Sequence, residues 1–258
     1  MTDDLEKAYG NQRFLSSPDG RPLRILAEYL EPAARFQRYK VDDTIVFFGS
    51  ARAPSPESLE KDGGADEKRR EMARYYDAAR ELAKRLTEWS KNLDDDDRRF
   101  VICSGGGPGI MEASNRGASE ARGINVGLNI SIPHEPSGNP HATRELTFEF
   151  HYFFMRKFWF AYLAKAVVVF PGGFGTLDEF FELMTLIQTG KIRKRMPIVL
   201  FGKDYWHRVI NFEALVEFGT ISAGDLDLFF DTDSVEEAFD HITKELTEYA
   251  LPHPGLSL

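Results

Sequence analysis

The sequence has few of the features that would support a covalently cross-linked or membrane-spanning protein. Cys103 is the single cysteine among 258 residues, which excludes an intrachain disulfide framework and a cysteine-rich zinc site. Its apolar runs, such as residues 166–170, are far too short to cross a bilayer. The acidic start MTDDLEK lacks the apolar segment of a secretory signal. We therefore expect a cytoplasmic protein that does not bind membranes.

An excess of positive charge is also missing. Lys and Arg total 32 against 41 Asp and Glu, which gives a formal net charge of −9. A protein that binds duplex nucleic acid needs a basic face, so nucleic acid is not an expected partner. The hydrophobic share of 42% is sufficient for a buried core and excludes intrinsic disorder as the main state.

The sequence does contain a regular alternation of short apolar runs and amphipathic segments. The expected strands cover residues 44–48, 100–103, 125–132, 146–150, 166–170, 197–201 and 228–231. The expected helices cover residues 66–93, 108–122, 153–165, 176–189, 205–218 and 234–249. Continuously apolar strands separated by helices are typical of a parallel sheet with both faces covered. Residues 41–258 are therefore predicted to form an α/β domain with a Rossmann-like, doubly wound parallel sheet.

Residues 1–40 precede this alternation and are expected to form an N-terminal helical extension. The first 20 residues are polar and are interpreted as a lead-in. Apolar residues recur at helical spacing in 22–39, with an interruption of the pattern at Pro32, so this segment is expected to form one or two helices and suggests an arm for oligomerisation. Within the main domain, composition predicts a surface loop at 53–64 and an acidic turn at 94–97.

Three predicted strands end in glycine-rich turns. One turn holds Gly49 and Ser50, and the others lie at 105–109 and 171–176. Glycine lets the backbone approach a phosphate closely, and the helix that follows presents free N–H groups. Any tight strand–helix turn also favours glycine, but two such turns that each open a helix favour a phosphate-bearing ligand. Neither turn is a P-loop, and the first strand does not end in the dinucleotide fingerprint.

Polar residues near these turns have both structural and functional interpretations. The order Thr176, Leu177, Asp178, Glu179 fits a capping box, with Thr176 as N-cap and Glu179 reaching back to its N–H. Arg156 and Lys157 fit a solvated helix face equally well. From the residues alone, we infer an anionic, nucleotide-like ligand beside a carboxylate and an arginine.

The histidines, as possible metal ligands, and the cysteine, as a possible nucleophile, give weaker indications of function. The histidines His134, His141 and His151 lack the spacing of a metal site, so no metal is expected. Cys103 ends a buried strand and is expected in the core rather than as a nucleophile.

Three segments together resemble the LONELY GUY (LOG) family of cytokinin-activating phosphoribohydrolases, formerly described as lysine decarboxylases. They are GGGPGIME at 105–112, MRK at 155–157 and PGGFGTLDE at 171–179. The likeness runs roughly from residue 44 to 241, and it identifies Arg156 and Glu179 as the catalytic residues. Short family members carry a Met-His pair where this sequence has residues 153–155, which leaves the preferred base open.

The resemblance implies hydrolysis of the N-glycosidic bond of a nucleoside 5′-monophosphate, AMP or a cytokinin riboside monophosphate, to free base and ribose 5-phosphate. Glu179 would stabilise the positive charge that grows on the ribose and orient the attacking water. Arg156 would hold that carboxylate and the ribose, and no metal or other cofactor is implied. The expected substrate-binding residues are Ser50, Gly105, Gly106, Gly107, Lys157, Gly172, Gly173, Gly175 and Thr176.

Two alternatives to hydrolysis stay open at this point. One is a non-catalytic carrier of a nucleotide or of molybdenum cofactor, because relatives of this fold bind such ligands without cleaving them. The other is an amino-acid decarboxylase, which would need a lysine that forms a Schiff base with pyridoxal phosphate; the sequence offers no recognisable setting for one. The resemblance further implies at least a homodimer.

Overall fold

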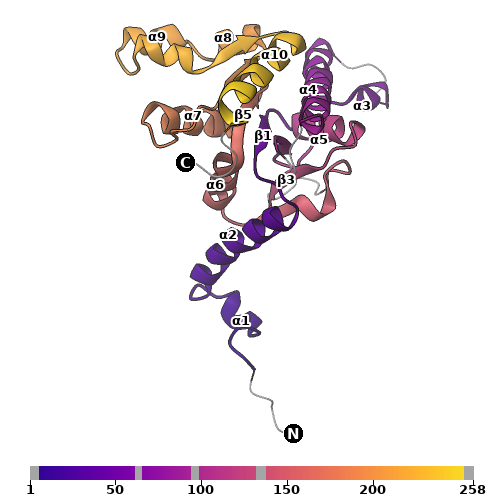
Figure 1. Ribbon diagram of the computed structural model, residues 1–258, viewed down its shortest axis with the longest axis vertical. Helices are drawn as coiled ribbons and strands as arrows, with labels where there is room; N and C mark the ends of the chain where they lie inside the picture. The colour runs from indigo at the N-terminus through magenta and orange to yellow at the C-terminus, as the bar shows by residue number, and fades with distance from the viewer. Residues whose placement is uncertain (1–5, 62–65, 94–98, 132–137, 253–258) are drawn as a thin grey trace.

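A seven-stranded parallel sheet forms the centre of the computed structural model, which describes residues 6–61, 66–93, 99–131 and 138–252 (Figure 1). The strands are β1 (Thr44–Phe48), β2 (Val101–Ser104), β3 (Asn125–Ile130), β4 (Thr147–Phe150), β5 (Ala164–Val169), β6 (Ile198–Phe201) and β7 (Phe230–Thr232). Their order is β4-β3-β2-β1-β5-β6-β7, and all neighbours are parallel. The chain winds outward from β1 in one direction and from β5 in the other. The predicted doubly wound, Rossmann-like α/β fold is confirmed.

Helices cover both faces of this sheet. They are α1 (Gln12–Leu15), α2 (Arg21–Arg38), α3 (Pro56–Lys61), α4 (Glu67–Lys91), α5 (Ile110–Glu120), α6 (Phe153–Leu163), α7 (Phe174–Gln188), α8 (Lys203–Val209), α9 (Phe212–Glu217) and α10 (Val235–Glu245), with short helical turns η1 (Arg144–Leu146), η2 (Ala223–Leu228) and η3 (Leu246–Ala250). In these described ranges, no helix combines the length and apolar character needed to cross a membrane.

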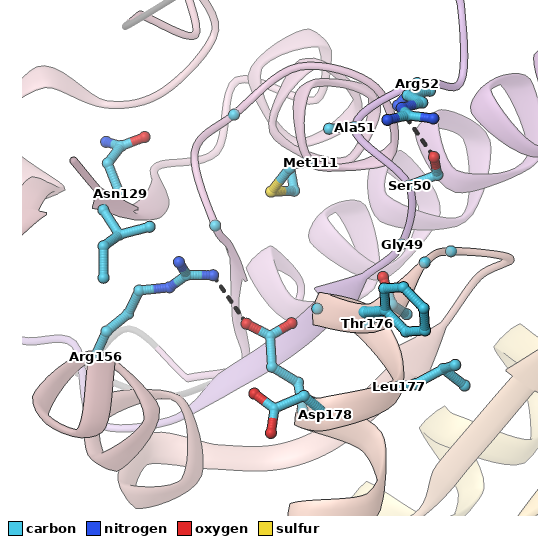
Figure 2. A pocket seen from close by; sticks show the side chains of 18 of the residues that line it. Gly49, Ser50, Ala51, Arg52, Met111, Asn129, Arg156, Thr176, Leu177 and Asp178 are labelled. Atoms are coloured by element: carbon cyan, nitrogen blue, oxygen red, sulfur yellow. Dashed lines mark hydrogen bonds and ion pairs between the residues drawn. The ribbon is translucent and has the colours of Figure 1, made fainter. Parts of the chain in front are cut away.

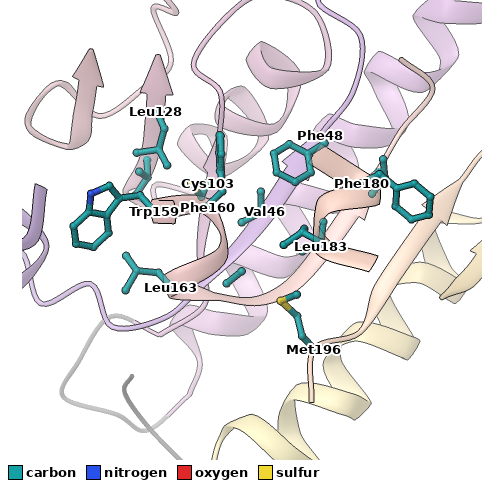
Figure 3. Packing of buried hydrophobic residues seen from close by; sticks show 14 of the residues in the cluster. Val46, Phe48, Cys103, Leu128, Trp159, Phe160, Leu163, Phe180, Leu183 and Met196 are labelled. Carbon is teal, nitrogen blue, oxygen red and sulfur yellow. The ribbon is translucent and has the colours of Figure 1, made fainter. Parts of the chain in front are cut away.

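The core is divided into two clusters by the sheet. Ile45 and Phe47 of β1 pack with α4, α5 and α10 on one face. Val46 and Phe48 pack with α6, α7 and α8 on the other face, part of which Figure 3 shows. Because successive side chains of β1 point to opposite covered faces, the whole strand is buried.

Several predicted elements differ from the observed ones. The single helix expected at 205–218 is two helices, α8 and α9, because Ile210 is extended and the side chain of Asn211 caps α9. The loop expected at 53–64 contains α3, and the polar lead-in contains α1. Strand β2 begins one residue later than expected, since Phe100 has a left-handed φ of 56°. The acidic turn expected at residues 94 to 97 lies outside the described residues.

Of the one or two helices expected around Pro32, the structure has one, because α2 is a continuous helix of 18 residues that contains this proline. Proline has no N–H to donate to the carbonyl four residues earlier, which is that of Glu28. The indole Nε1–H of Trp159 in α6 donates to this carbonyl instead, at 3.0 Å. A hydrogen bond between the two helices thus replaces the one that α2 lacks.

Glu28 also holds the beginning of α6. Its carboxylate accepts hydrogen bonds from the backbone N–H groups of His151, at 2.8 Å, and Tyr152, at 3.2 Å. N–H groups at a helix N-terminus have no acceptor within the helix, and a negative charge there also interacts favourably with the helix dipole. Phe36 of α2 packs against Trp159 with ring centroids 5.3 Å apart. The N-terminal extension therefore helps to position α6.

We predict that Glu28→Ala lowers the free energy of unfolding by about 1–2 kcal/mol, because the N–H groups of the two residues that lead into α6, His151 and Tyr152, lose their acceptor. Urea denaturation measures this loss. Glu31→Ala is the matched control on the same helix: Glu31 forms an exposed ion pair with Arg35, and such pairs contribute about 0–1 kcal/mol. Equal effects of the two substitutions would show that Glu28 has no special role in holding α6.

Candidate active site

A cavity of about 1040 Å³ lies at the carboxyl ends of the strands, where the direction of winding reverses between β1 and β5 (Figure 2). In doubly wound sheets this is the position where ligands bind. The turns after β1, β2 and β5 contribute to its wall. The N–H of Ser50 donates to the carbonyl oxygen of Pro171 at 3.0 Å, which holds two of these turns together. The glycine-rich turns found in the sequence therefore meet at one site.

The glycines of these turns serve two different purposes. A Cβ at Gly172 would lie 2.1 Å from Thr176 Oγ1, and one at Gly105 would lie 2.5 Å from Met111 Sδ, so these glycines permit close packing within the protein. A Cβ at Gly173 or Gly175 would have no atom within 4 Å. These two glycines, at the start of the 15-residue helix α7, instead leave space for a ligand to approach free backbone N–H groups.

The capping box expected at Thr176 and Glu179 is wrong. Helix α7 begins at Phe174, with Gly173 as its N-cap, so Thr176 is the third residue of the helix. The helix starts earlier than the side-chain pattern indicates because Gly173 takes the capping position. Glu179 then lies beyond the first turn and does not reach back to a backbone N–H. Its carboxylate is available for contacts within the cavity.

Glu179 is paired with Arg156. Arg156 Nη2 donates to Glu179 Oε1 at 2.8 Å, and the dashed line from Arg156 in Figure 2 marks this contact. Only 12% of the arginine side chain and 14% of the glutamate side chain are exposed. Burial raises the pKa of Glu179 to about 7, although the positive charge of Arg156 acts in the opposite direction. A carboxyl with this pKa can exchange a proton near neutral pH.

The surroundings of Arg156 hold its guanidinium beside the carboxylate. The group lies over the ring of Phe160, with 5.3 Å between Cζ and the ring centroid. A cation over an aromatic face is attracted by the electron density of the ring. Its Nε is buried and has no hydrogen-bond partner among the described residues. The ion pair with Glu179 is therefore the main contact that fixes this cation.

Most of the predicted site residues line the cavity, but Lys157 and Gly106 do not. Lys157 Nζ lies 2.7 Å from Asp178 Oδ2 and 3.3 Å from Glu182 Oε2, on the outer side of α7. Gly106 has a φ of 69° and donates its N–H to Ser104 Oγ at 3.1 Å, so it shapes the turn. The predicted residues brought together at the cavity are Ser50, Gly105, Gly107, Arg156, Gly172, Gly173, Gly175, Thr176 and Glu179.

The remaining candidates from the sequence lie elsewhere. Cys103 is buried in β2, and burial raises the pKa of its thiol, which is consistent with a core position. His134 lies outside the described residues. Within the ranges that the structure describes, no group of three or more His, Cys, Asp or Glu side chains could hold a metal ion.

One side of the cavity is formed by residues that the sequence did not identify as site residues. Asn129, Ser131 and Glu149 line it from the carboxyl ends of β3 and β4, together with Phe153 at the start of α6. The signal was available, because carboxyl ends of parallel strands meet at one edge of the sheet. These strand ends carry no glycine-rich turn and were therefore overlooked.

Comparisons with known proteins agree with these features. The family model described as "Possible lysine decarboxylase" matches residues 111–242, slightly more than half of the chain. A cytokinin riboside 5′-monophosphate phosphoribohydrolase of Arabidopsis thaliana is 28% identical over 183 residues, which cover 69% of this chain and 77% of that relative. A probable enzyme of the same name from Oryza sativa subsp. japonica is 26% identical over 219 residues, 83% of this chain and 82% of that relative.

Among solved structures, a Moco carrier protein from Chlamydomonas reinhardtii superimposes with a TM-score of 0.50. The alignment covers 80% of this chain and 99% of that protein at 18% identity, so it supports the fold alone. The family match extends over the helices and strands that carry Arg156 and Glu179. The chain therefore belongs to the LONELY GUY family, for which "possible lysine decarboxylase" is the older description.

Proposed function

We propose that this protein hydrolyses the N-glycosidic bond of a nucleoside 5′-monophosphate, AMP or a cytokinin riboside monophosphate, to the free base and ribose 5-phosphate. The observation that carries the proposal is the buried pair of Arg156 and Glu179 inside a cavity built from glycine-rich turns. The curated relatives named above are phosphoribohydrolases of this kind.

The phosphate binds at the end of the cavity formed by the turns after β1 and β5. Free N–H groups at the N-terminus of α7 and its positive dipole end favour a dianion there. The open space at Gly173 and Gly175 lets the phosphate approach the backbone. The side chain of Arg52 also lines the cavity near Ser50 and supplies positive charge at this end.

Glu179 acts on the ribose and on water. As the bond between the anomeric carbon and the base nitrogen breaks, its electron pair leaves with the base, and positive charge grows on the sugar. The Glu179 carboxylate stabilises that charge and accepts a proton from the water whose oxygen bonds to the anomeric carbon. The proton that Glu179 accepted passes to the nitrogen of the departing base, which yields the neutral free base and returns Glu179 to its ionised form. Arg156 holds the carboxylate in place for these steps.

The cavity does not support a decarboxylase, despite the older family description. No lysine is among the described residues that line it. Burial would lower the pKa of nearby Lys157, but the hydrogen bond that Lys157 donates to Asp178 and the negative charge of Glu182 outweigh this effect and raise the pKa. A Schiff-base lysine needs the opposite shift, because only the uncharged amine is a nucleophile.

The first prediction from the proposed function concerns Glu179→Gln, which removes the negative charge but keeps the size of the side chain. We expect the turnover of AMP per folded molecule to fall by about 10² or more. The melting temperature should fall as well, because the buried charge of Arg156 loses its ionised partner. Release of free adenine, followed by chromatography, measures the turnover. Glu182→Gln is the matched control, because Glu182 lies on the same helix but outside the cavity. Full activity of Glu179→Gln would contradict the assigned role, and nucleotide binding without base release by the wild type would indicate a carrier.

The second prediction concerns the 5′-phosphate. Binding energy from this remote group fixes the ribose against Glu179, so kcat/KM for AMP should exceed that for adenosine by at least about 10². Gly175→Ala should reduce this preference by about tenfold, because its methyl group occupies space that the phosphate needs.

Gly224→Ala is the control for that experiment, since a Cβ at Gly224 also meets no atom within 4 Å but lies in η2, outside the cavity. Equal turnover of AMP and adenosine by the wild-type protein would contradict the phosphate site.

The proposal includes a closed assembly of at least two copies. Leu23, Leu26 and Leu30 follow one another along α2 and are 47%, 49% and 53% exposed. Exposed apolar side chains that share a helix face are typical of an interface. We expect light scattering to give at least a dimer mass, and the double substitution Leu26→Glu with Leu30→Glu to lower it. A monomer mass for the wild type at micromolar concentration would contradict this part of the proposal.

A further inference from the structure

The turn between β5 and α7 contains a peptide bond that the local sequence leaves free to rotate. This bond joins Gly172 to Gly173, and it is the one peptide of residues 171–176 with glycine on both sides. Rotation of its plane changes ψ of the first residue and φ of the second, and glycine accepts many values of both angles. A contact from another part of the chain must therefore fix the direction in which this peptide points.

Tyr205 of α8 makes that contact. Its hydroxyl donates to the carbonyl oxygen of Gly172 at 2.5 Å. Burial raises the pKa of Tyr205 above its ordinary value, so the hydroxyl keeps the proton that it donates. The ring packs edge-on against Trp206, whose indole Nε1–H donates to the carbonyl of Phe201 at the end of β6. Tyr205 is thereby anchored to the sheet.

The direction of the Gly172 carbonyl determines the direction of the next N–H. The peptide is trans, and in a trans peptide these two groups point to opposite sides. With the oxygen of Gly172 turned toward Tyr205, the N–H of Gly173 points away from the tyrosine hydroxyl. Within the part of the chain that the structure describes, this N–H has no acceptor. Gly173 lines the cavity, and a Cβ there would meet no atom within 4 Å, so its N–H is open to a ligand.

The hydrogen bond from Tyr205 also polarises this peptide. A carbonyl that accepts a hydrogen bond makes the N–H of the same peptide a stronger donor, because hydrogen bonds in a chain reinforce one another. The chain here runs from the Tyr205 hydroxyl to the carbonyl of Gly172 and continues from the N–H of Gly173 to a bound anion. A phosphate dianion benefits most, because hydrogen bonds to a charged acceptor are the stronger ones.

Resting on the function proposed above, we propose that Tyr205 is a positioning residue for the 5′-phosphate. Its hydroxyl holds the peptide between Gly172 and Gly173 so that the N–H of Gly173 donates to a phosphate oxygen. Without the hydroxyl, the Gly172 carbonyl loses its donor and gains another, a water molecule, by turning into the cavity. The turned peptide presents a partly negative oxygen to the phosphate in place of an N–H. Tyr205 thus controls the phosphate site without touching the substrate.

Tyr205→Phe tests this role, because it removes the hydroxyl and keeps the ring. The ratio of kcat/KM for AMP to kcat/KM for adenosine should fall about tenfold, the effect of one hydrogen bond to a charged group. The value for adenosine itself should change little, since adenosine has no phosphate to place. Tyr76→Phe is the matched control: the Tyr76 hydroxyl donates to Glu112 Oε1 at 2.8 Å, and neither residue lines the cavity. An unchanged ratio in Tyr205→Phe, or an equal fall in both variants, would overturn the assignment.

The N–H of Gly173 can also be followed directly by nuclear magnetic resonance. Glycine-selective isotope labelling limits the amide spectrum to 21 residues, and Gly173→Ala identifies the resonance of interest by its loss. Saturation of the wild type with ribose 5-phosphate should move this resonance downfield, as expected for an N–H that donates to an anion. Tyr205→Phe should reduce the movement. A resonance that stays in place in the wild type would overturn the proposed hydrogen bond.

The affinity for ribose 5-phosphate separates the role of Tyr205 from the proposed reaction. Calorimetry should give a dissociation constant about tenfold higher for Tyr205→Phe than for the wild type. If the wild type releases no base from AMP, the hydrolase proposal fails, but a weaker affinity in Tyr205→Phe still supports the positioning role. Equal affinities would overturn that role and leave the proposed hydrolysis intact. If the wild type does not bind ribose 5-phosphate, the phosphate site and the role of Tyr205 are both overturned.

Discussion

The ion pair between Arg156 and Glu179 joins α6 to α7 at a place where neither side chain is well solvated. A buried charge costs free energy unless it is paired and hydrogen-bonded, so each of these residues requires the other. The pair forms only if both helices begin at the correct residues. Glu28 of α2 holds the N-terminus of α6, and Gly173 caps α7. The chemistry of the site therefore depends on contacts made at two helix ends.

The sheet determines what surrounds this pair. All carboxyl ends of parallel strands lie at one edge, and the reversal of winding between β1 and β5 opens a cavity there. Strands near the reversal end in glycine-rich turns and present N–H groups. Strands β3 and β4, farther out, end in polar side chains that present acceptors. The wall of the cavity thus combines backbone N–H donors from the glycine-rich turns with side-chain oxygen acceptors from β3 and β4.

The strands were predictable because burial on both faces leaves a continuous apolar run. Residues 44–48 were identified as a strand with the bounds that β1 has in the structure. The ends of the helices were harder to predict, because neighbouring short sequence patterns indicate different first residues for the same helix. Thr176 and Glu179 have the spacing of a capping box, but Gly173 begins the helix earlier. The break between α8 and α9 depends on the backbone at Ile210, which helical periodicity does not reveal.

The site residues were only partly predictable, because the sequence alone does not reveal which side chains point into the cavity. Arg156 and Lys157 are neighbours in sequence, but consecutive helical residues point about 100° apart, so only Arg156 enters the cavity. The sequence left open whether Pro32 divides α2 into two helices, and the hydrogen bond from the distant Trp159 explains why the helix continues through this proline. The acceptors at Asn129 and Glu149 become recognisable once β3 and β4 are known to be neighbours. In the last two cases, contacts between distant segments of the chain decided the outcome.

The pH dependence of kcat/KM for base release from AMP tests the central role of the buried pair most directly. Glu179 must be ionised to act, so the rate should rise tenfold per pH unit below about pH 7, the pKa of Glu179, and level off above it. In Arg156→Met the apparent pKa should move upward, because the cation that favours the carboxylate is gone. The second ionisation of the AMP phosphate, near pH 6, does not depend on Arg156 and cannot produce this shift. A profile that is flat across neutral pH, or the same apparent pKa in both proteins, would contradict the account.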